Sequence, residues 1–248
     1  MKKGIIKTPF FEIGAKNYMY GEELLKVAKA ADQAAIEHDI DVIFIAPYAD
    51  IRLLAEHTRR LLIFAPYMDS LRPGRGLAAI LPEGIKAAGA KGVMLNHSEK
   101  PMTLPELEAT IKRAKELDLL TLVCAGSIQE AQAVACFAPD IINPEESELI
   151  GSGSVSDADF VERSTQAIRQ INPHILVEHA AGITTGQQVE SLILAGADGA
   201  GAASGVFKAE DPLAKSQEFI LAVRKAIAIM SAERDEYRLR IMNKLSIN

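Results

Sequence analysis

Residues 81–100 read LPEGIKAAGAKGVMLNHSEK, and they contain a helix, a turn and a strand in immediate succession. The first part, LPEGIKAAG, predicts a short helix. The next part, GVML, is an apolar run without alternation, which is typical of a strand buried on both faces, as in a parallel sheet. The strand is followed closely by His97, which is either a packed side chain or an acid–base group of a functional site.

The same alternation of short apolar runs and longer amphipathic runs extends along the chain. Most short runs are rich in Ile, Val, Leu or Phe, while the last consists mainly of Gly and Ala. These runs are FFEIGA (10–15), DVIFIAP (41–47), LLIFAP (61–66), GVMLNH (92–97), LLTLVCAG (119–126), DIINPE (140–145), ILVEHA (175–180) and GADGAGAAS (196–204). The longer runs place apolar residues on one helical face. The clearest are GEELLKVAKAADQAAIEH (21–38), TLPELEATIKRAKEL (103–117), SDADFVERSTQAIRQI (156–171), TTGQQVESLILAG (184–196) and DPLAKSQEFILAVRKAIAIM (211–230).

Eight strands that alternate with eight helices predict an α/β fold of the (β/α)8 barrel type, with residues 1–248 in a single domain. An open, doubly wound sheet is the alternative, but it usually has a glycine-rich phosphate turn after its first strand. The sequence at that place, EIGAKNYMYG (12–21), has no GxGxxG pattern. Residues 230–248 are charged and amphipathic. We expect them to form a helical extension that continues the last helix or packs against a neighbouring one.

Composition limits the classes of function. Apolar residues make up 48% of the 248 residues, which predicts a globular protein with a sizeable core. The net charge of −6 argues against nucleic acid as a partner, because phosphate backbones attract basic surfaces. No apolar run approaches the ~20 residues of a membrane span, and we expect no signal peptide because Lys7 and Pro9 interrupt the N-terminal apolar segment. Two cysteines, Cys124 and Cys136, form no disulfide framework, so we expect a reducing, cytoplasmic location.

Ionisable residues follow three of the predicted strands. Lys16 follows the first strand, His97 the fourth and Glu145 the sixth. A barrel brings the carboxyl ends of all its strands to one rim, so these side chains are expected to converge there. Taken singly, they could be a solvated lysine, a packed histidine and one charge of a solvated loop. Taken together they predict an acid–base site, and glycines after the last two strands suit a phosphate held by backbone N–H groups.

Several segments resemble the triosephosphate isomerase family, and most closely its short archaeal-type branch. LNHSE (95–99) resembles the histidine segment of that family, and ELIGSG (148–153) resembles the end of its flexible sixth loop. AAGITTG (180–186) and ASGVFKAEDP (203–212) resemble its two phosphate-binding segments. These segments occur in the family's order between Phe11 and Pro212. The resemblance implies a TIM barrel and an aldose–ketose isomerase that acts without a cofactor.

The resemblance also implies roles for individual residues. Lys16 corresponds to the lysine that neutralises substrate charge, and His97 to the electrophile that polarises the carbonyl group. Glu99 corresponds to the carboxylate that organises the site, and Glu145 to the catalytic base. The residues that correspond to the phosphate-binding positions are Gly151, Gly182, Ser204 and Gly205.

Other positions depart from the family pattern. Gly14 stands where the family has an asparagine beside the substrate, which removes a polar contact and opens space. Leu77 replaces a threonine that reaches across the dimer, and Pro66 replaces a glutamine. In the sixth loop, Glu146 and Ser147 replace a rigid hinge that contains proline. Glu146 could raise the pKa of a neighbouring carboxyl group or face solvent.

Two functions remain open on these grounds. We expect an isomerase that acts on triose phosphate or on a larger sugar phosphate of four or five carbons, in a homo-oligomer that is a dimer or a tetramer. The alternative is a non-catalytic relative that binds a sugar phosphate for regulation. We expect no metal site, since His57 and His97 have no cysteine or carboxylate partners at ligand spacing. His179 is either an additional substrate contact or a packed core residue.

Overall fold

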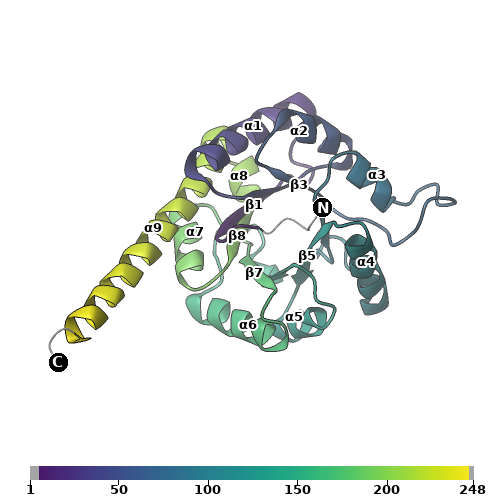
Figure 1. The fold of residues 1–248 in the computed structure, drawn as a ribbon. Helices are drawn as coiled ribbons and strands as arrows, with labels where there is room; N and C mark the ends of the chain where they lie inside the picture. The colour runs from purple at the N-terminus through teal and green to yellow at the C-terminus, as the bar shows by residue number, and fades with distance from the viewer. Residues whose placement is uncertain (1–5, 246–248) are drawn as a thin grey trace.

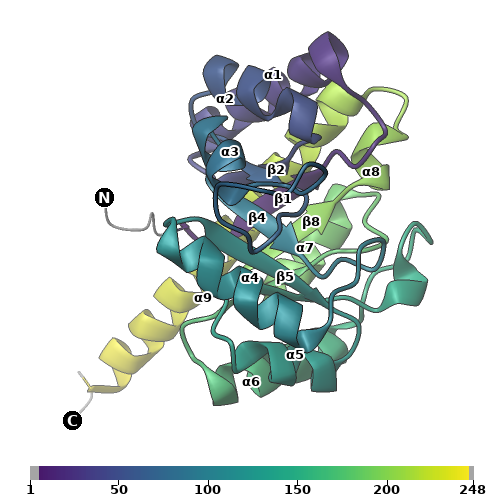
Figure 2. The same ribbon diagram turned by 90° about the vertical axis from the view of Figure 1, so that its right-hand side faces the viewer.

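The computed structural model describes residues 6–245, with side chains except at residue 147 and at residues 236–245. Eight parallel strands form a closed barrel in which each strand pairs with its neighbours in chain order and β8 pairs with β1. Figures 1 and 2 show the barrel in two views. The strands are β1 (Phe10–Gly14), β2 (Val42–Ile45), β3 (Leu62–Ala65), β4 (Gly92–Leu95), β5 (Leu120–Ala125), β6 (Ile141–Pro144), β7 (Leu176–His179) and β8 (Gly199–Ala202). The predicted (β/α)8 fold is therefore confirmed.

Helices form a ring around the barrel (Figure 1). They are α1 (Gly21–His38), α2 (Ile51–His57), α3 (Pro82–Ala87), α4 (Leu104–Glu116), α5 (Ile128–Ala135), α6 (Ala158–Ile171), α7 (Gly186–Leu194), α8 (Ser204–Phe207) and α9 (Pro212–Leu245), with short 3-10 turns at Tyr48–Asp50 and Ser147–Leu149. The short helix α8, which the sequence pattern did not indicate, follows β8 directly and precedes α9. Among the described residues, no helix combines the length and apolar composition that a membrane span requires.

Alternation along the strands divides the core into two layers. Phe10 points into the barrel, where it packs with apolar side chains of other strands such as Ile43 and Phe64. Phe11, its neighbour, points outward and packs against Phe219 of α9 with ring centroids 5.6 Å apart. Because successive side chains on a strand point to opposite faces, Glu12 and Gly14 share the inward direction of Phe10.

Local sequence signals set the helix starts. Thr103 caps α4 by accepting a hydrogen bond from the Glu106 backbone, and the Glu106 side chain accepts one from the Thr103 backbone. Thr185 and Gln188 form the same reciprocal arrangement at α7. This capping box satisfies backbone N–H groups that the first helical turn leaves without partners, so the helices begin at defined positions after their strands.

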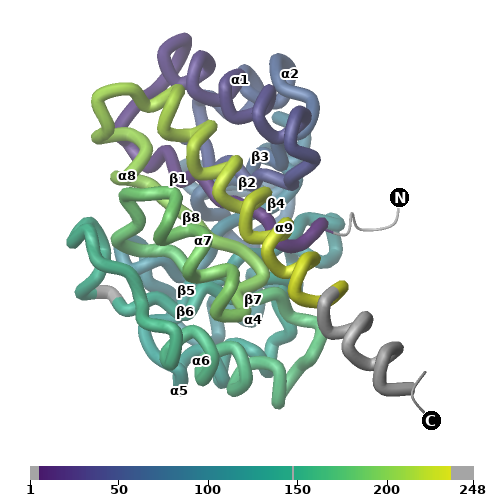
Figure 3. Tube along the Cα trace, turned by 90° about the vertical axis from the view of Figure 1, so that its left-hand side faces the viewer, coloured from purple at the N-terminus to yellow at the C-terminus, as the bar shows by residue number. Residues whose placement is uncertain are grey.

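The last helix is longer than its neighbours. It packs along α1 and α7, as Figure 3 shows, and then continues away from the ring of helices (Figure 1). It runs without a break through residue 230, where the sequence pattern suggested that an extension begins. Residues 246–248 of that extension lie outside the described residues.

His179 lies in the layer between the barrel and α6. It is fully buried, its Nε2 is 3.3 Å from Ser164 Oγ, and its ring meets Phe160 edge-on at 6.0 Å. Burial lowers the pKa of His179 to about 4, so the ring is neutral at physiological pH. Of the two interpretations of this residue, packing in the core is the one that its position supports.

Two glycines allow close contacts between the segments that follow β6, β7 and β8. A Cβ atom at Gly182 would stand 1.6 Å from the carbonyl oxygen of Ser154, and one at Gly205 would stand 1.9 Å from that of Ile183. Neither approach leaves room for a side chain. These glycines therefore fix the relative position of three loops at the carboxyl end of the barrel.

We predict that Gly205→Ala lowers the free energy of unfolding by about 1–3 kcal/mol, because its methyl group would displace the Ile183 backbone. Gly84→Ala is the matched control. A Cβ atom there would have only an ordinary contact of 3.8 Å with Leu81, and Gly84 lies within α3. It should be neutral or slightly stabilising, since alanine favours helix over glycine. Denaturant unfolding of both variants tests this, and equal stabilities would contradict the packing argument.

Candidate active site

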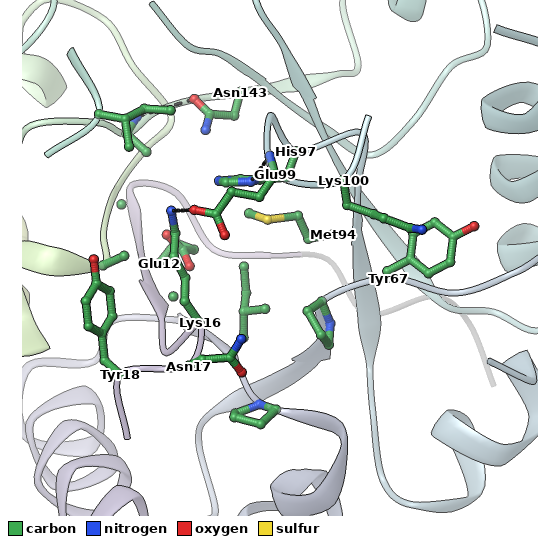
Figure 4. A pocket seen from close by; sticks show the side chains of 18 of the residues that line it. Glu12, Lys16, Asn17, Tyr18, Tyr67, Met94, His97, Glu99, Lys100 and Asn143 are labelled. Atoms are coloured by element: carbon green, nitrogen blue, oxygen red, sulfur yellow. Dashed lines mark hydrogen bonds and ion pairs between the residues drawn. The ribbon is translucent and has the colours of Figure 1, made fainter. Parts of the chain in front are cut away.

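A cavity of about 1060 Å³ opens at the carboxyl end of the barrel. It contains most of the residues that the sequence assigned to a functional site, and Figure 4 shows it from close by. The assigned residues that line it are Lys16, His97, Glu99, Glu145, Gly14, Gly151, Gly182 and Ser204. Side chains that are distant in sequence therefore meet in one cavity.

Lys16 lies two residues after β1 and extends into the cavity. Its backbone has φ of 44°, in the left-handed region that residues other than glycine rarely adopt. Its Nζ donates a hydrogen bond of 2.7 Å to Glu99 Oε1, and the two side chains form an ion pair. Such uncommon backbone conformations occur often at functional sites. The ion pair connects the loop after β1 with the loop after β4.

His97 is held by the turn that follows β4. Asn96, with φ of 57°, donates from its side chain to the Cys124 carbonyl and to Glu130, and it accepts from the Met102 backbone. The backbone N–H of Glu99 donates to His97 Nδ1 at 3.1 Å. Since that N–H can only donate, Nδ1 carries no proton, and in the neutral ring the proton is on Nε2.

The charge state of His97 follows from its surroundings. Burial lowers the pKa of His97, and the positive charge of Lys16 lowers it further, while Glu99 acts in the opposite direction. The ring is therefore neutral at physiological pH. A neutral imidazole with its proton on Nε2 is a hydrogen-bond donor that can polarise a carbonyl oxygen.

Glu145 comes directly after β6. Its backbone N–H donates to the Ala125 carbonyl at 2.8 Å, and the residue is 7% exposed. Burial raises the pKa of Glu145, Lys16 opposes this shift, and Glu99 adds to it. The negative charge that raises the pKa of Glu145 is therefore that of Glu99 across the cavity. The sequence pattern had suggested the adjacent Glu146 for this effect. A carboxylate with a raised pKa is a stronger base than a solvated one.

Loops after β6, β7 and β8 surround one end of the cavity. Gly151, Gly182 and Ser204 line this end, together with Lys208. Gly205 does not line it, so the structure does not bring this assigned residue to the cavity surface; it lies against the Ile183 carbonyl instead. The first two N–H groups of α8 have no partner within the helix. Backbone donors and a lysine therefore meet at this end.

The opposite end has an aromatic wall. Tyr67 donates from its hydroxyl to Asp69 at 3.0 Å, and Tyr48 donates to the Tyr67 carbonyl at 3.1 Å. Burial raises the pKa of Tyr67 to about 12, so its hydroxyl stays protonated. Lys100 Nζ lies 5.1 Å from the centroid of the Tyr67 ring. Pro66, which marks a departure from the family pattern, lies at the start of this wall.

Polar residues within the strands also lie in or near the cavity, and the sequence pattern did not indicate them. Glu12 and Asn143 line the cavity, and Glu178 lies deeper in the barrel. Each belongs to a run that was interpreted as apolar strand. The available signal was a charged or amide residue in such a run, as in FFEIG (10–14) and ILVEH (175–179). Among residues 6–245, no group of three or more His, Cys, Asp or Glu side chains is arranged to hold a metal ion.

Comparison with known proteins gives a consistent result. The family model described as triosephosphate isomerase matches residues 10–222. The triosephosphate isomerase of Methanobacterium bryantii is 38% identical over 213 residues, which is 84% of this chain and 94% of that protein. That of Methanocaldococcus jannaschii is 37% identical over 198 residues, 79% of this chain and 90% of that protein. That of Methanothermus fervidus is 33% identical over 217 residues, 86% and 97% of the two chains.

We predict that Lys16→Met raises the pKa of His97, because it removes the positive charge that disfavours imidazolium. Glu99→Gln should shift the same pKa downward, since it removes the negative charge that favours imidazolium. NMR titration of the histidine rings measures both shifts. His179, on the outer side of β7, serves as the internal control and should keep its pKa of about 4. Shifts in the same direction for the two variants would contradict this electrostatic description.

Proposed function

This chain belongs to the triosephosphate isomerase family, and on that basis we propose that it interconverts an aldose phosphate and a ketose phosphate by proton transfer through an enediolate. The substrate is triose phosphate or a related sugar phosphate of four or five carbons. The observation that carries the proposal is the position of Glu145 in the same cavity as the connected residues Lys16, Glu99 and His97.

The proposed steps need no external oxidant or reductant. Glu145 takes a proton from the hydroxyl-bearing carbon next to the carbonyl group. The electrons of that C–H bond form a carbon–carbon double bond, and the carbonyl oxygen becomes negatively charged. His97, through its Nε2–H, and Lys16 stabilise this charge. His97 moves a proton between the two oxygens, and Glu145 returns its proton to the neighbouring carbon, which leaves the carbonyl group one carbon away.

The second candidate, a regulatory protein that binds a sugar phosphate without turnover, has less support. Binding alone would not require a buried carboxylate with a raised pKa and a neutral, oriented imidazole in the same cavity. Ionisable residues whose pKa values are shifted in one cavity are typical of sites for acid–base catalysis. Gly14 and Pro66, which depart from the family pattern, line the cavity but supply neither an acid nor a base. We expect them to influence which sugar phosphate binds.

We further propose that the protein works in the cytoplasm as a homo-oligomer. The segment between β3 and α3 protrudes from the ring of helices (Figure 1), and Leu77 on this segment is fully exposed. An exposed leucine on a protruding segment can be covered by contact with another protein surface. A dimer or a tetramer would bury it.

We predict that Glu145→Gln lowers kcat by about a thousandfold, because the amide cannot accept the proton. The variant should keep its fold, since the shapes of the two side chains match. Glu146→Gln is the neighbouring control and should retain most of the activity. Steady-state kinetics with both variants decides the assignment. If Glu146→Gln is the inactive one, the base has been misplaced by one residue.

We also predict that dihydroxyacetone phosphate binds and that dihydroxyacetone does not. The loops at Gly151, Gly182 and Ser204, with Lys208, present donors and positive charge that match a phosphate group. Titration calorimetry measures both ligands under the same conditions. Lys208→Met should weaken binding of the phosphorylated form. Equal affinity for the two forms would remove the assignment of a phosphate-binding end.

A further inference from the structure

The cavity contains a carboxyl group that the proposed reaction does not use. Glu12 lies on β1 and points toward the barrel axis, on the same face of the strand as Gly14. It is 4% exposed, yet it lines the cavity close to Lys16 (Figure 4), and the charges of Glu145 and Lys16 both act on it. Within the described part of the chain, its Oε1 has no hydrogen-bond partner. Glu12 is thus a buried residue of the cavity lining with one carboxyl oxygen that has no partner among the described residues.

Two glycines make this arrangement possible. A Cβ atom at Gly14 would stand 3.0 Å from Glu12 Oε1, so a larger side chain there would cover the carboxyl group. Gly201 is opposite Glu12 on β8, and its Cβ atom would stand 2.5 Å from Glu12 Oε2 and 2.4 Å from Glu178 Oε1. The two carboxyl groups therefore take the volume that a side chain on β8 would otherwise fill. Glu178 is the deeper of the two and is not among the residues that line the cavity.

Two buried carboxyl groups in the interior of the barrel lower the stability of the fold. Barrel interiors are usually filled by branched apolar side chains. A buried polar group without a partner costs about 1–3 kcal/mol. Among the described residues, neither carboxyl oxygen of Glu178 has a hydrogen-bond partner. A group that enters the cavity and bonds to Glu12 would recover part of this cost, which favours a binding role over a packing role for Glu12.

The protonation of the pair determines what it can bind. Burial, and then the negative charge of Glu178, hold the pKa of Glu12 well above its usual range, and burial raises the pKa of Glu178 to about 8. These shifts favour the protonated form of Glu12, which has one O–H donor and an acceptor oxygen. A hydroxyl group, which also donates and accepts, is the matching partner.

A triose phosphate has no spare hydroxyl group for this position. One of its carbons carries the phosphate, and the other two carry the oxygens that take part in the reaction. A sugar phosphate of four or five carbons has at least one further carbon with a hydroxyl group. Resting on the isomerase function proposed above, we propose that Glu12 binds this additional hydroxyl group beside Gly14 and thereby selects sugar phosphates longer than a triose.

The test compares two ketose phosphates that differ by one carbon, dihydroxyacetone phosphate and erythrulose 4-phosphate, the latter as both enantiomers. Initial rates are followed by phosphorus NMR for the unmodified protein, Glu12→Leu and Glu12→Gln. Unmodified protein should have the higher kcat/KM with one enantiomer of the four-carbon ketose. Glu12→Leu should lower that value by about 10- to 100-fold and change the triose value by less than about threefold. Glu12→Gln should keep most of the preference, because the amide also donates and accepts.

Two further variants separate recognition from structure. Glu178→Gln alters the same buried pair below the cavity and should leave the ratio of the two kcat/KM values unchanged. Gly14→Asn would cover Glu12 and should shift the ratio toward the triose. A fall in kcat/KM of similar size for both sugars in Glu12→Leu would overturn the assignment of Glu12. A higher kcat/KM for the triose in unmodified protein would also overturn it.

Binding without turnover distinguishes this proposal from the isomerase function. Titration calorimetry with erythrulose 4-phosphate compares two inactive proteins. One carries Glu145→Gln alone, and the other carries Glu145→Gln together with Glu12→Leu. Binding that weakens about 10-fold or more when Glu12 is replaced supports the hydroxyl site, even if unmodified protein turns over neither sugar and the isomerase function fails. Equal binding by both proteins overturns the hydroxyl site, even if triose phosphate is isomerised.

Discussion

Closing eight parallel strands into a barrel leaves no sheet edge and sends the carboxyl ends of all strands to one rim. The candidate site depends on this constraint. Lys16, His97 and Glu145 follow the first, fourth and sixth strands and meet only because the barrel closes. Inward-facing residues of the same strands line the cavity below these three side chains. A substitution at such a position, for example Glu12 on β1, therefore changes both the packing of the barrel and the cavity.

Electrostatics within the cavity centre on Lys16. Its ammonium group binds Glu99, lowers the pKa of His97 and opposes the rise in the pKa of Glu145. Burial is the larger cause of the lowered pKa of His97, and the charge of Lys16 adds to it while favouring the carboxylate form of Glu145. Glu99 connects the two sides, since its carboxylate holds Lys16 while its backbone N–H fixes the tautomer of His97.

The sequence predicted the rim better than the interior of the barrel. Lys16, His97 and Glu145 could be located because each directly follows an apolar run, and the barrel fixes where such residues lie. Glu12 could not be assigned to the cavity, because a strand pattern does not distinguish the face toward the axis from the face toward the helices. Gly205 was assigned to phosphate binding by its motif, but it lies against the Ile183 carbonyl and is not among the residues that line the cavity. Contacts between loops depend on tertiary packing, which no local pattern encodes.

The proton transfer through Glu145 is tested most directly by exchange with solvent. Dihydroxyacetone phosphate and erythrulose 4-phosphate are incubated with the protein in deuterium oxide and examined by NMR. An enediolate whose proton passes through Glu145 predicts deuterium at the carbon next to the carbonyl group, in the product and in recovered substrate, for at least one of the two sugars. Glu145→Gln should reduce this exchange together with turnover. Isomerisation without deuterium incorporation, or no exchange above the rate without protein for either sugar, would contradict the proposed chemistry.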